Sequence, residues 1–300
     1  MALNGSDLVA EATREHILNT ARRLGYRVNR TASSLASGKT GLLGLVLPDL
    51  RNPFFDFMAH ALQKAAAERS LVLLLALASD TMTASAVVES MLSMRVEGLI
   101  LISPVVDDES IRRLGEECPT CLVGRASVGG AVDTVRLDED AAADMVIEHL
   151  SSRGARRLAY CAPQDDPVMG ERFRALVGAA ERQGMELARL DVAKTSEGWL
   201  RRLASSGGLG IVAHNDMVAL DVDAALRTAS LPVPLVSYDD TYLARRDEFS
   251  FTSVEQPAPL MAGEAVRLLR ERCESLGEVG AAGRIVTVPP VLAVRRSSRR

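Results

Sequence analysis

The stretch Tyr26–Phe57, YRVNRTASSLASGKTGLLGLVLPDLRNPFFDF, changes character three times. Its first part, Asn29–Ser37, is small, polar and compatible with a helix, and Leu35 is its one large apolar side chain. Gly38–Gly41 breaks that pattern, and Leu42–Leu47 is a continuous apolar run with the length of a buried strand. A turn and a helix-start signal follow this run. The stretch therefore predicts a linker that leads directly into the first strand of a folded domain.

Beyond this stretch, apolar runs of strand length alternate with helical patterns. We predict buried parallel strands at 42–47, 71–76, 99–102, 121–123, 134–137, 158–161, 210–213, 235–237 and 284–287. Helical patterns lie between them, and the strands fall into two blocks. This repetition predicts an α/β fold made of two lobes, each a doubly wound parallel sheet. The tail 295–300 is basic, and we expect it to be loose.

The residues before Gly41 form a small basic head on an acidic body. In this head, basic side chains outnumber acidic ones, with Arg14, Arg22, Arg23, Arg27, Arg30 and Lys39 against Asp7, Glu11 and Glu15. The chain as a whole has a net charge of −4. One amphipathic helix, Glu11–Leu24, is predicted in the head, and a single helix cannot bury its own apolar stripe. This uneven charge suits a small nucleic-acid contact on a body that binds something else.

Composition places the chain among ordinary globular proteins, with 300 residues of which 47% are hydrophobic and 25% charged. No apolar segment is long enough to span a bilayer, and no signal-peptide core is present, so we expect a cytoplasmic protein with no membrane partner. Cys118 and Cys121 have the spacing of a redox or zinc pair. They follow a predicted helix, however, and no second close pair accompanies them, so we expect neither a metal nor a cofactor.

The residues just after the strands are the candidates for a binding site, because ligands of such sheets lie beyond the carboxyl ends of the strands. They mix aromatic rings, arginine, short acids and amides, and they lie at 49–55, 79–80, 124–125, 214–216 and 238–240. This mixture suits a polar, hydroxyl-bearing small molecule. The alternative is that Asn215 and Asp239 only cap the helices that follow them.

At these positions the chain resembles the lactose-repressor (LacI/GalR-type) family of transcriptional regulators. The resemblance rests on LNGSDLVAEATREHILNTARRLGYRVN, SLASGKTGLLGLVLPDLRNPFF, VEGLILISP, ARRLAY, AHNDMVAL, VSYDD and TSVEQP, which occur in this order and cover nearly the whole chain. The family implies a two-lobed fold like that of periplasmic binding proteins. It also implies a hinge helix that orders on operator DNA, a small sugar-like effector, and a homodimer.

The resemblance assigns DNA contacts to the linker. Leu35 matches the leucine that wedges into the minor groove and bends the duplex; the alternative is that it is the buried face of a short helix. Arg27, Arg30 and Lys39 would meet phosphates beside it, and Ser34 would also lie at the DNA. Ser33 stands where the family usually has arginine, so this chain departs from the family's pattern at that DNA contact.

The resemblance assigns effector contacts to residues of both lobes. They are Phe54, Phe55, Arg125, Arg172, Asn215 and Asp239. Phe54 also shares a helical stripe with Met58 and Leu62, so a core role is the alternative. Glu139 replaces a common asparagine and Ser237 a usual glycine, so the effector is expected to be unusual.

The family opens with a helix-turn-helix, and residues 1–28 match only its last part, so we expect either an upstream start or a lost reading head. We divide the chain into this remnant at 1–28, a hinge helix and linker at 29–41, and an effector-binding domain at 42–300. Its N-lobe is expected at about 42–136 and 255–275, and its C-lobe at about 137–254 and 276–300.

We therefore expect a DNA-binding transcriptional regulator, a repressor controlled by an effector held between its lobes. The alternatives are a truncated effector-binding and dimerisation protein, and a solute-binding protein of the same fold. An enzyme is not expected, because Gly207–Gly210 precedes a strand and so is no phosphate loop. His16, His60, His149 and His214 are isolated in the sequence, which is typical of surface or capping residues.

Overall fold

The computed structural model describes residues 10–24, 39–78, 83–104, 106–163, 169–191, 197–205, 207–274 and 281–299. The chain divides into two compact units, Met1–Gly41 and Leu42–Arg300. In the first unit, helix α1 spans Glu11–Arg23, where the sequence predicted a helix, and Leu24 behind it is exposed.

The DNA-contact predictions fall almost entirely outside the described residues. This holds for Arg27, Arg30, Ser34 and Leu35 and for the predicted hinge helix around them. Lys39 is described, and its side chain is exposed.

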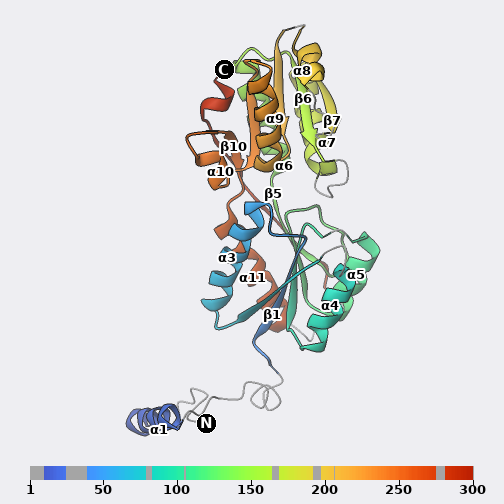
Figure 1. Cartoon of the computed structure of the whole chain (residues 1–300). Coiled ribbons are helices and arrows are strands. Elements are labelled where there is room, and N and C mark those ends of the chain that lie inside the picture. The colour runs from blue at the N-terminus through green and yellow to red at the C-terminus, as the bar shows by residue number, and fades with distance from the viewer. Residues whose placement is uncertain are drawn as a thin grey trace. The chain divides into compact units, whose positions relative to one another are not determined.

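The second unit contains two sheets, which define an N-lobe and a C-lobe (Figure 1). The N-lobe sheet is parallel and has the order β11-β5-β4-β3-β1-β2. Its strands are β1 (Leu42–Leu47), β2 (Val72–Leu77), β3 (Gly98–Ile102), β4 (Thr120–Val123), β5 (Asp133–Leu137) and β11 (Ile285–Val288).

The C-lobe sheet has the order β12-β10-β9-β8-β6-β7 and is parallel except for the antiparallel edge pair of β10 and β12. Its strands are β6 (Arg157–Ala162), β7 (Glu186–Asp191), β8 (Leu209–Ala213), β9 (Leu235–Asp239), β10 (Thr252–Glu255) and β12 (Val291–Ala293). The α/β class and the two doubly wound lobes predicted from the sequence are confirmed.

Helices cover both faces of each sheet (Figure 1). In the N-lobe these are α3 (Pro53–Ala67) and α11 (Ala258–Glu274) on one face, and α4 (Ala84–Ser93) and α5 (Asp108–Glu117) on the other. In the C-lobe they are α6 (Glu139–Ser152) and α7 (Met169–Arg182) on one face, and α8 (Glu197–Ala204), α9 (Asp216–Thr228) and α10 (Tyr242–Arg245) on the other.

The pleat of each strand decides which helices its side chains meet. Along β1, Leu43, Leu45 and Leu47 pack into the cluster that contains α3 and α11, whereas Val46 packs toward α4 and α5. Both faces are therefore buried, which explains why the strand is a continuous apolar run in the sequence.

Within the described residues, the chain passes from one lobe to the other after β5, after β10 and after β11. The third passage corrects the prediction that all of 276–300 belongs to the C-lobe. Strand β11 pairs with β5 in the N-lobe sheet, and only β12 behind it pairs with β10 in the C-lobe. Sequence periodicity marks such a strand but does not say which sheet edge accepts it.

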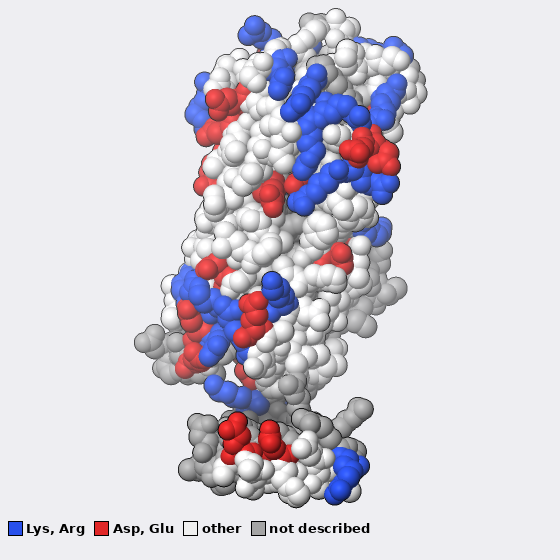
Figure 2. Space-filling view, turned by 90° about the vertical axis from the view of Figure 1, so that its left-hand side faces the viewer, with Lys and Arg blue, Asp and Glu red and all other residues white. Residues whose placement is uncertain are grey.

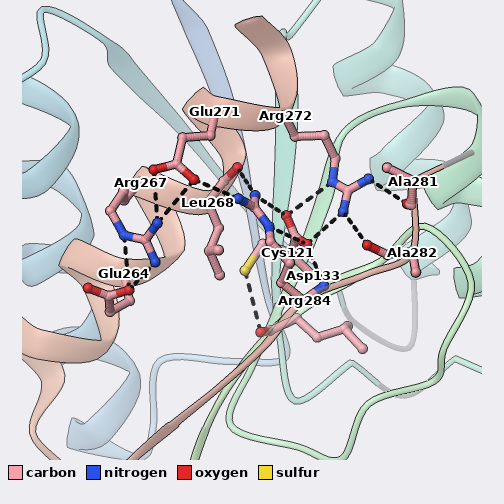
Figure 3. A network of polar contacts seen from close by, with 11 residues as sticks. Cys121, Asp133, Glu264, Arg267, Leu268, Glu271, Arg272, Ala281, Ala282 and Arg284 are labelled. Carbon is pink, nitrogen blue, oxygen red and sulfur yellow. Dashed lines mark hydrogen bonds and ion pairs between the residues drawn. The ribbon is translucent and has the colours of Figure 1, made fainter. Parts of the chain in front are cut away.

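An ion-pair network joins the start of β11 to β5 and α11 (Figure 3). Asp133 at the start of β5 is fully buried and accepts from Arg272 of α11 at 2.7 Å and from Arg284 beside β11 at 2.9 Å. Arg284 also pairs with Glu271 of α11. Burial alone would raise the pKa of Asp133, but the hydrogen bonds from Arg272 and Arg284 outweigh it and hold that pKa below the usual value.

The C-terminal tail is bound to the C-lobe, which corrects the expectation that it is loose. A short 3-10 helix, Arg296–Ser298, places Ser297 and Ser298 at zero exposure. The Ser297 hydroxyl accepts from the Thr252 amide at 2.8 Å and donates to the Leu235 carbonyl at 2.6 Å. The basic residues help to anchor the tail as well, since Arg295 pairs with Asp240 at 2.6 Å and donates to the Phe251 carbonyl at 2.8 Å.

Figure 2 shows Lys and Arg side chains beside Asp and Glu on the lower part of the body, whereas Lys and Arg predominate on its upper part. Along α11, Arg267 pairs with Glu264 and Glu271, and Arg270 pairs with Glu274. Exposed pairs of this kind contribute little stability, but they leave this part of the body without a surface of one sign.

Candidate functional site

Asn52 joins the two lobes at the carboxyl end of β1. Its backbone is extended, and its Oδ1 accepts from the Phe54 amide at 3.0 Å, which caps α3. The Nδ2 of the same side chain donates to Asp239 Oδ2 at 3.1 Å, across to the end of β9. One amide therefore begins a helix of the N-lobe and contacts the C-lobe.

Asp239 is buried without a cation of its own. It accepts from Asn52 and from Gln256 Nε2 at 2.6 Å, and no ion pair to it occurs in the part of the chain that the structure describes. Burial raises the pKa of Asp239, although Arg172 and these hydrogen bonds oppose that rise. Its φ of 96° lies in a region that non-glycine residues avoid, and such strain is concentrated at functional sites. The helix that follows is capped by Thr241, so the capping alternative for Asp239 was wrong.

A buried ion pair lies on the C-lobe side of the site. Arg172 of α7 donates to Glu139 of α6 from Nη2 at 2.8 Å and from Nε at 3.1 Å, and the two residues are 2% and 7% exposed. The Nη1 atom of Arg172 donates to the His214 carbonyl at 2.6 Å, and its guanidinium lies 4.0 Å from the ring centre of Tyr238. Burial alone would lower the pKa of Arg172, but the Glu139 carboxylate raises it, so the guanidinium stays charged.

Two tyrosines, Tyr160 and Tyr238, lie beside the Arg172–Glu139 ion pair. Tyr160 of β6 shares a 2.6 Å hydrogen bond with His214 Nδ1, and both side chains are buried. The sequence placed His214 among surface or capping residues, and this was wrong. The hydroxyl of Tyr238 is also fully buried, and no described residue forms a hydrogen bond with it. A buried hydroxyl without a partner is uncommon and needs an explanation.

A second polar cluster lies on the other face of β9. Asp216, at the start of α9, accepts from Ser237, Ser253 and Thr241, with Ser237 at 2.5 Å and the Thr241 amide at 2.7 Å. Burial and the charge of Asp239 raise the pKa of Asp216 to about 7. Ser237, which stands where the family usually has glycine, thus adds a donor to this carboxylate.

The remaining predicted effector residues have other contacts. The Oδ1 atom of Asn215 accepts from the Val218 amide at 2.9 Å and so caps α9. This is the capping role that the sequence offered as the alternative to an effector contact. Phe54 is buried among core residues of α3, and Phe55 is half-buried with its ring 5.8 Å from that of Phe54. Arg125 donates to Asp108 Oδ1 at 2.6 Å within the N-lobe.

Two further contacts join the lobes near the site. Arg136 of β5 pairs with Glu171, the residue before Arg172 on α7. Phe57 of α3 lies edge-on to Tyr242 of α10, with ring centres 6.4 Å apart. The lobes therefore meet through α3 and through β5, and the buried polar residues lie near both contacts.

Other chemistry has little support in the described residues. They contain no group of three or more His, Cys, Asp or Glu side chains placed to hold a metal ion. Burial raises the pKa of the Cys118 thiol to about 12 and raises that of Cys121, so both favour the protonated, unreactive form. None of the helices in the described ranges is long and apolar enough to cross a bilayer.

Comparison with known proteins defines the class. Residues 40–207 match the model of periplasmic binding proteins and the sugar binding domain of the LacI family, and residues 147–298 match that of the periplasmic binding protein-like domain. Together with the two-lobed fold, these matches show that the chain belongs to the LacI family of transcriptional regulators.

Individual relatives are similar over most of their length. The HTH-type transcriptional regulator PtxS of Pseudomonas plecoglossicida is 30% identical over 89% of this chain and 82% of its own. A solved complex of the transcriptional regulator CelR with cellobiose is 27% identical, with a TM-score of 0.71 over 99% of this chain and 94% of that one. A LacI transcriptional regulator from a Rhodococcus species is 25% identical, with a TM-score of 0.77 over 86% of this chain and 98% of that one.

Proposed function

We propose that this chain is a repressor whose affinity for operator DNA is controlled by a small polar effector, a sugar or related metabolite, bound between the N-lobe and the C-lobe. The hydrogen bond between Asn52 and Asp239 carries this proposal, because it brings a strand end of each lobe together beside the buried Arg172–Glu139 pair. Carboxylates accept hydroxyl hydrogens and guanidinium groups donate to hydroxyl oxygens, so these side chains suit a polyol. The cellobiose complex of the CelR relative supports the same class of ligand.

The effector would act by changing how the lobes are held together. Its hydroxyls would contact Asp239 beside the Asn52 amide and would contact both lobes at once, which favours the closed arrangement that the Asn52–Asp239 bond also stabilises. A ligand shifts such an equilibrium only by the difference in its affinity for the two arrangements. The N-lobe follows the linker directly in the chain, so its displacement would be transmitted to the paired hinge segments.

Binding of a panel of mono- and disaccharides, with cellobiose included, tests the effector site. Calorimetry on wild type and on Arg172→Met should give binding only to wild type. Arg182→Met is the matched control, because Arg182 lies on the same helix in an exposed pair with Asp144. Removing one partner of a buried ion pair lowers the free energy of unfolding by about 3–5 kcal/mol. The double variant Arg172→Met with Glu139→Gln leaves no unpaired buried charge, so it should be more stable than Arg172→Met alone and serves as a second variant without Arg172. Equal affinities for wild type and for folded Arg172 variants would contradict the site.

At the DNA, the hinge segment would wedge Leu35 into the minor groove, with phosphate contacts from Arg27, Arg30 and Lys39 and a further contact from Ser34. Duplexes selected by the protein from a random library supply an operator for the test. Leu35→Ala should reduce both affinity and the DNA bend measured by energy transfer, whereas the exposed Leu24→Ala should change neither. Unchanged bending in Leu35→Ala would contradict the wedge.

The repressor would act as a homodimer, whose two-fold symmetry matches two half-sites of a near-palindromic operator. The edge strand β2 supports a protein partner, because Leu75 and Leu77 on it are 45% and 37% exposed. Light scattering should give a dimer for wild type and a monomer for Leu75→Lys with Leu77→Lys. Met94→Lys is the control, since Met94 is an exposed residue at the end of α4.

A dimer that binds effector but no duplex would favour the alternative of an effector-binding and dimerisation protein without sequence-specific DNA binding. A monomer that binds effector but no duplex would favour a solute-binding role for the same fold.

A further inference from the structure

The buried groups around the proposed effector site carry more negative than positive charge. Glu139 and Asp239 are carboxylates, and Arg172 is the guanidinium that faces them. Asp240, the next residue along, is already matched by Arg245 at 2.9 Å and by Arg295 at 2.6 Å. Whether the site can bind an anionic ligand therefore depends on whether the Arg172 guanidinium is free to pair with it.

Little of that charge is available. The Nε and Nη2 atoms of Arg172 both donate to Glu139, and Nη1 donates to the His214 carbonyl. A carboxylate or phosphate on a ligand would have to displace Glu139 or lie beside it. Both are unfavourable in a buried site, because like charges repel strongly where water does not screen them.

Asp239 adds to the negative balance. Its two hydrogen-bond donors are the neutral amides of Asn52 and Gln256. Its charge is also one of the causes that raise the pKa of neighbouring Asp216 to about 7. A buried carboxylate of this kind is stabilised by hydroxyl or ammonium donors and destabilised by a further anion.

The Tyr238 hydroxyl is an independent sign of a ligand. It is fully buried, has no hydrogen-bond partner among the residues that the structure describes, and interacts electrostatically with Glu139, Arg172 and Tyr160. A ligand oxygen or nitrogen beside the Arg172–Glu139 pair would satisfy it.

We propose that the effector is an uncharged or positively charged polyol, with Glu139 selecting against sugar acids and sugar phosphates by occupying Arg172, and with Tyr238 donating to or accepting from the ligand. This inference rests on the proposed function, and it excludes anionic polyols as the effector.

The test is a charge series measured by calorimetry and thermal shift. For each of several hexoses and disaccharides, the neutral sugar, its amino derivative, its sugar acid and its phosphate are titrated onto the full chain. Wild type should bind the neutral or the amino form at least about tenfold more tightly than the acid or the phosphate. Glu139→Gln, which frees the Arg172 charge, should improve acid binding relative to neutral binding by about tenfold or more. The control Asp140→Asn removes the same charge one residue away on the exposed side of α6 and should change nothing.

Tyr238→Phe keeps the test decisive if Glu139→Gln folds poorly. Removing an unpartnered hydroxyl should leave the melting temperature equal or higher, and it should weaken binding of the preferred polyol about 3- to 10-fold. A merely structural tyrosine would leave the affinity unchanged. An acid bound by wild type as tightly as its neutral parent, or an unchanged preference in a folded Glu139→Gln, would overturn the charge assignment and leave an effector-responsive repressor in place. Binding of no member of the series would overturn the polyol effector and the charge assignment together.

Discussion

Replacing Asn52 by serine or by aspartate separates the two contacts that this side chain makes. Its Oδ1 caps α3 through the Phe54 amide at 3.0 Å, and its Nδ2 donates to Asp239 at 3.1 Å. Serine and aspartate are both good N-cap residues, so α3 should begin at the same place in both variants. Both variants lose the amide donor, so any change in how the lobes sit comes from the contact with Asp239.

The size of the effect follows from the acceptor. A hydrogen bond to a charged group contributes about 1.5–3 kcal/mol, because its removal leaves a buried carboxylate short of a donor. This corresponds to roughly a 10- to 150-fold shift of the equilibrium between closed and open lobes. Asn52→Asp should shift it further than Asn52→Ser, because it also places a second carboxylate next to Asp239.

Small-angle scattering measures this directly as the radius of gyration of the effector-free protein, which should increase in the order wild type, Asn52→Ser, Asn52→Asp. Calorimetry on the same proteins should show weaker effector binding in the same order, since the closed arrangement becomes less populated. Circular dichroism checks that α3 is retained. An unchanged radius and unchanged affinity in Asn52→Asp would refute a role for this bond in joining the lobes.

Three further predictions concern stability. Asp133→Asn should lower the free energy of unfolding by about 3 kcal/mol in urea denaturation at neutral pH, which is at the low end for a buried ion pair because Arg284 is 40% exposed. Since the folded pKa of Asp133 lies below 3.8, wild type should lose this stabilisation only as the pH falls below that value. The variant has no carboxylate to protonate there and should not show this loss of stability at acid pH. The pKa of Asp216 is raised to about 7 in the folded protein, so the free energy of unfolding should fall as the pH rises from about 4 to 7. Ser237 donates to the Asp216 carboxylate and lowers its pKa, so Ser237→Ala should make that fall larger by about 1 kcal/mol, measured by melting curves across this pH range. Ser297→Ala should cost about 1–3 kcal/mol and should speed amide exchange in β10, a result that a loose tail would not give.

The elements that the sequence determined are those with a local signal. Strand β1 was predicted with its observed bounds, because a run buried on both faces is apolar at every position. Helix α9 begins directly behind Asn215, which the sequence already offered as a cap for the helix that follows it.

Strand β7 shows where local signals end. Its sequence, ELARLD, is half charged, and its side chains are mostly exposed because it lies at the edge of the C-lobe sheet. Such a strand forms because β6 offers backbone hydrogen bonds, not because its own side chains are apolar. Strands β10 (TSVE) and β12 (VLA) are only four and three residues long, and the sequence did not mark either as a strand.

The sequence alone was enough to predict the α/β class and the family, and it named most of the residues after the strand ends as candidates for a binding site. Only the tertiary structure decided which of those residues meet. Asn52 and Asp239 are 187 positions apart, and Glu139 and Arg172 belong to different helices. Periodicity reports how one segment faces the core, but a contact between segments depends on how two sheets and their helices pack. The same reason explains the third passage, where a buried Asp133 on β5 and the arginines around β11 place the last N-lobe strand at an edge that the local pattern could not specify.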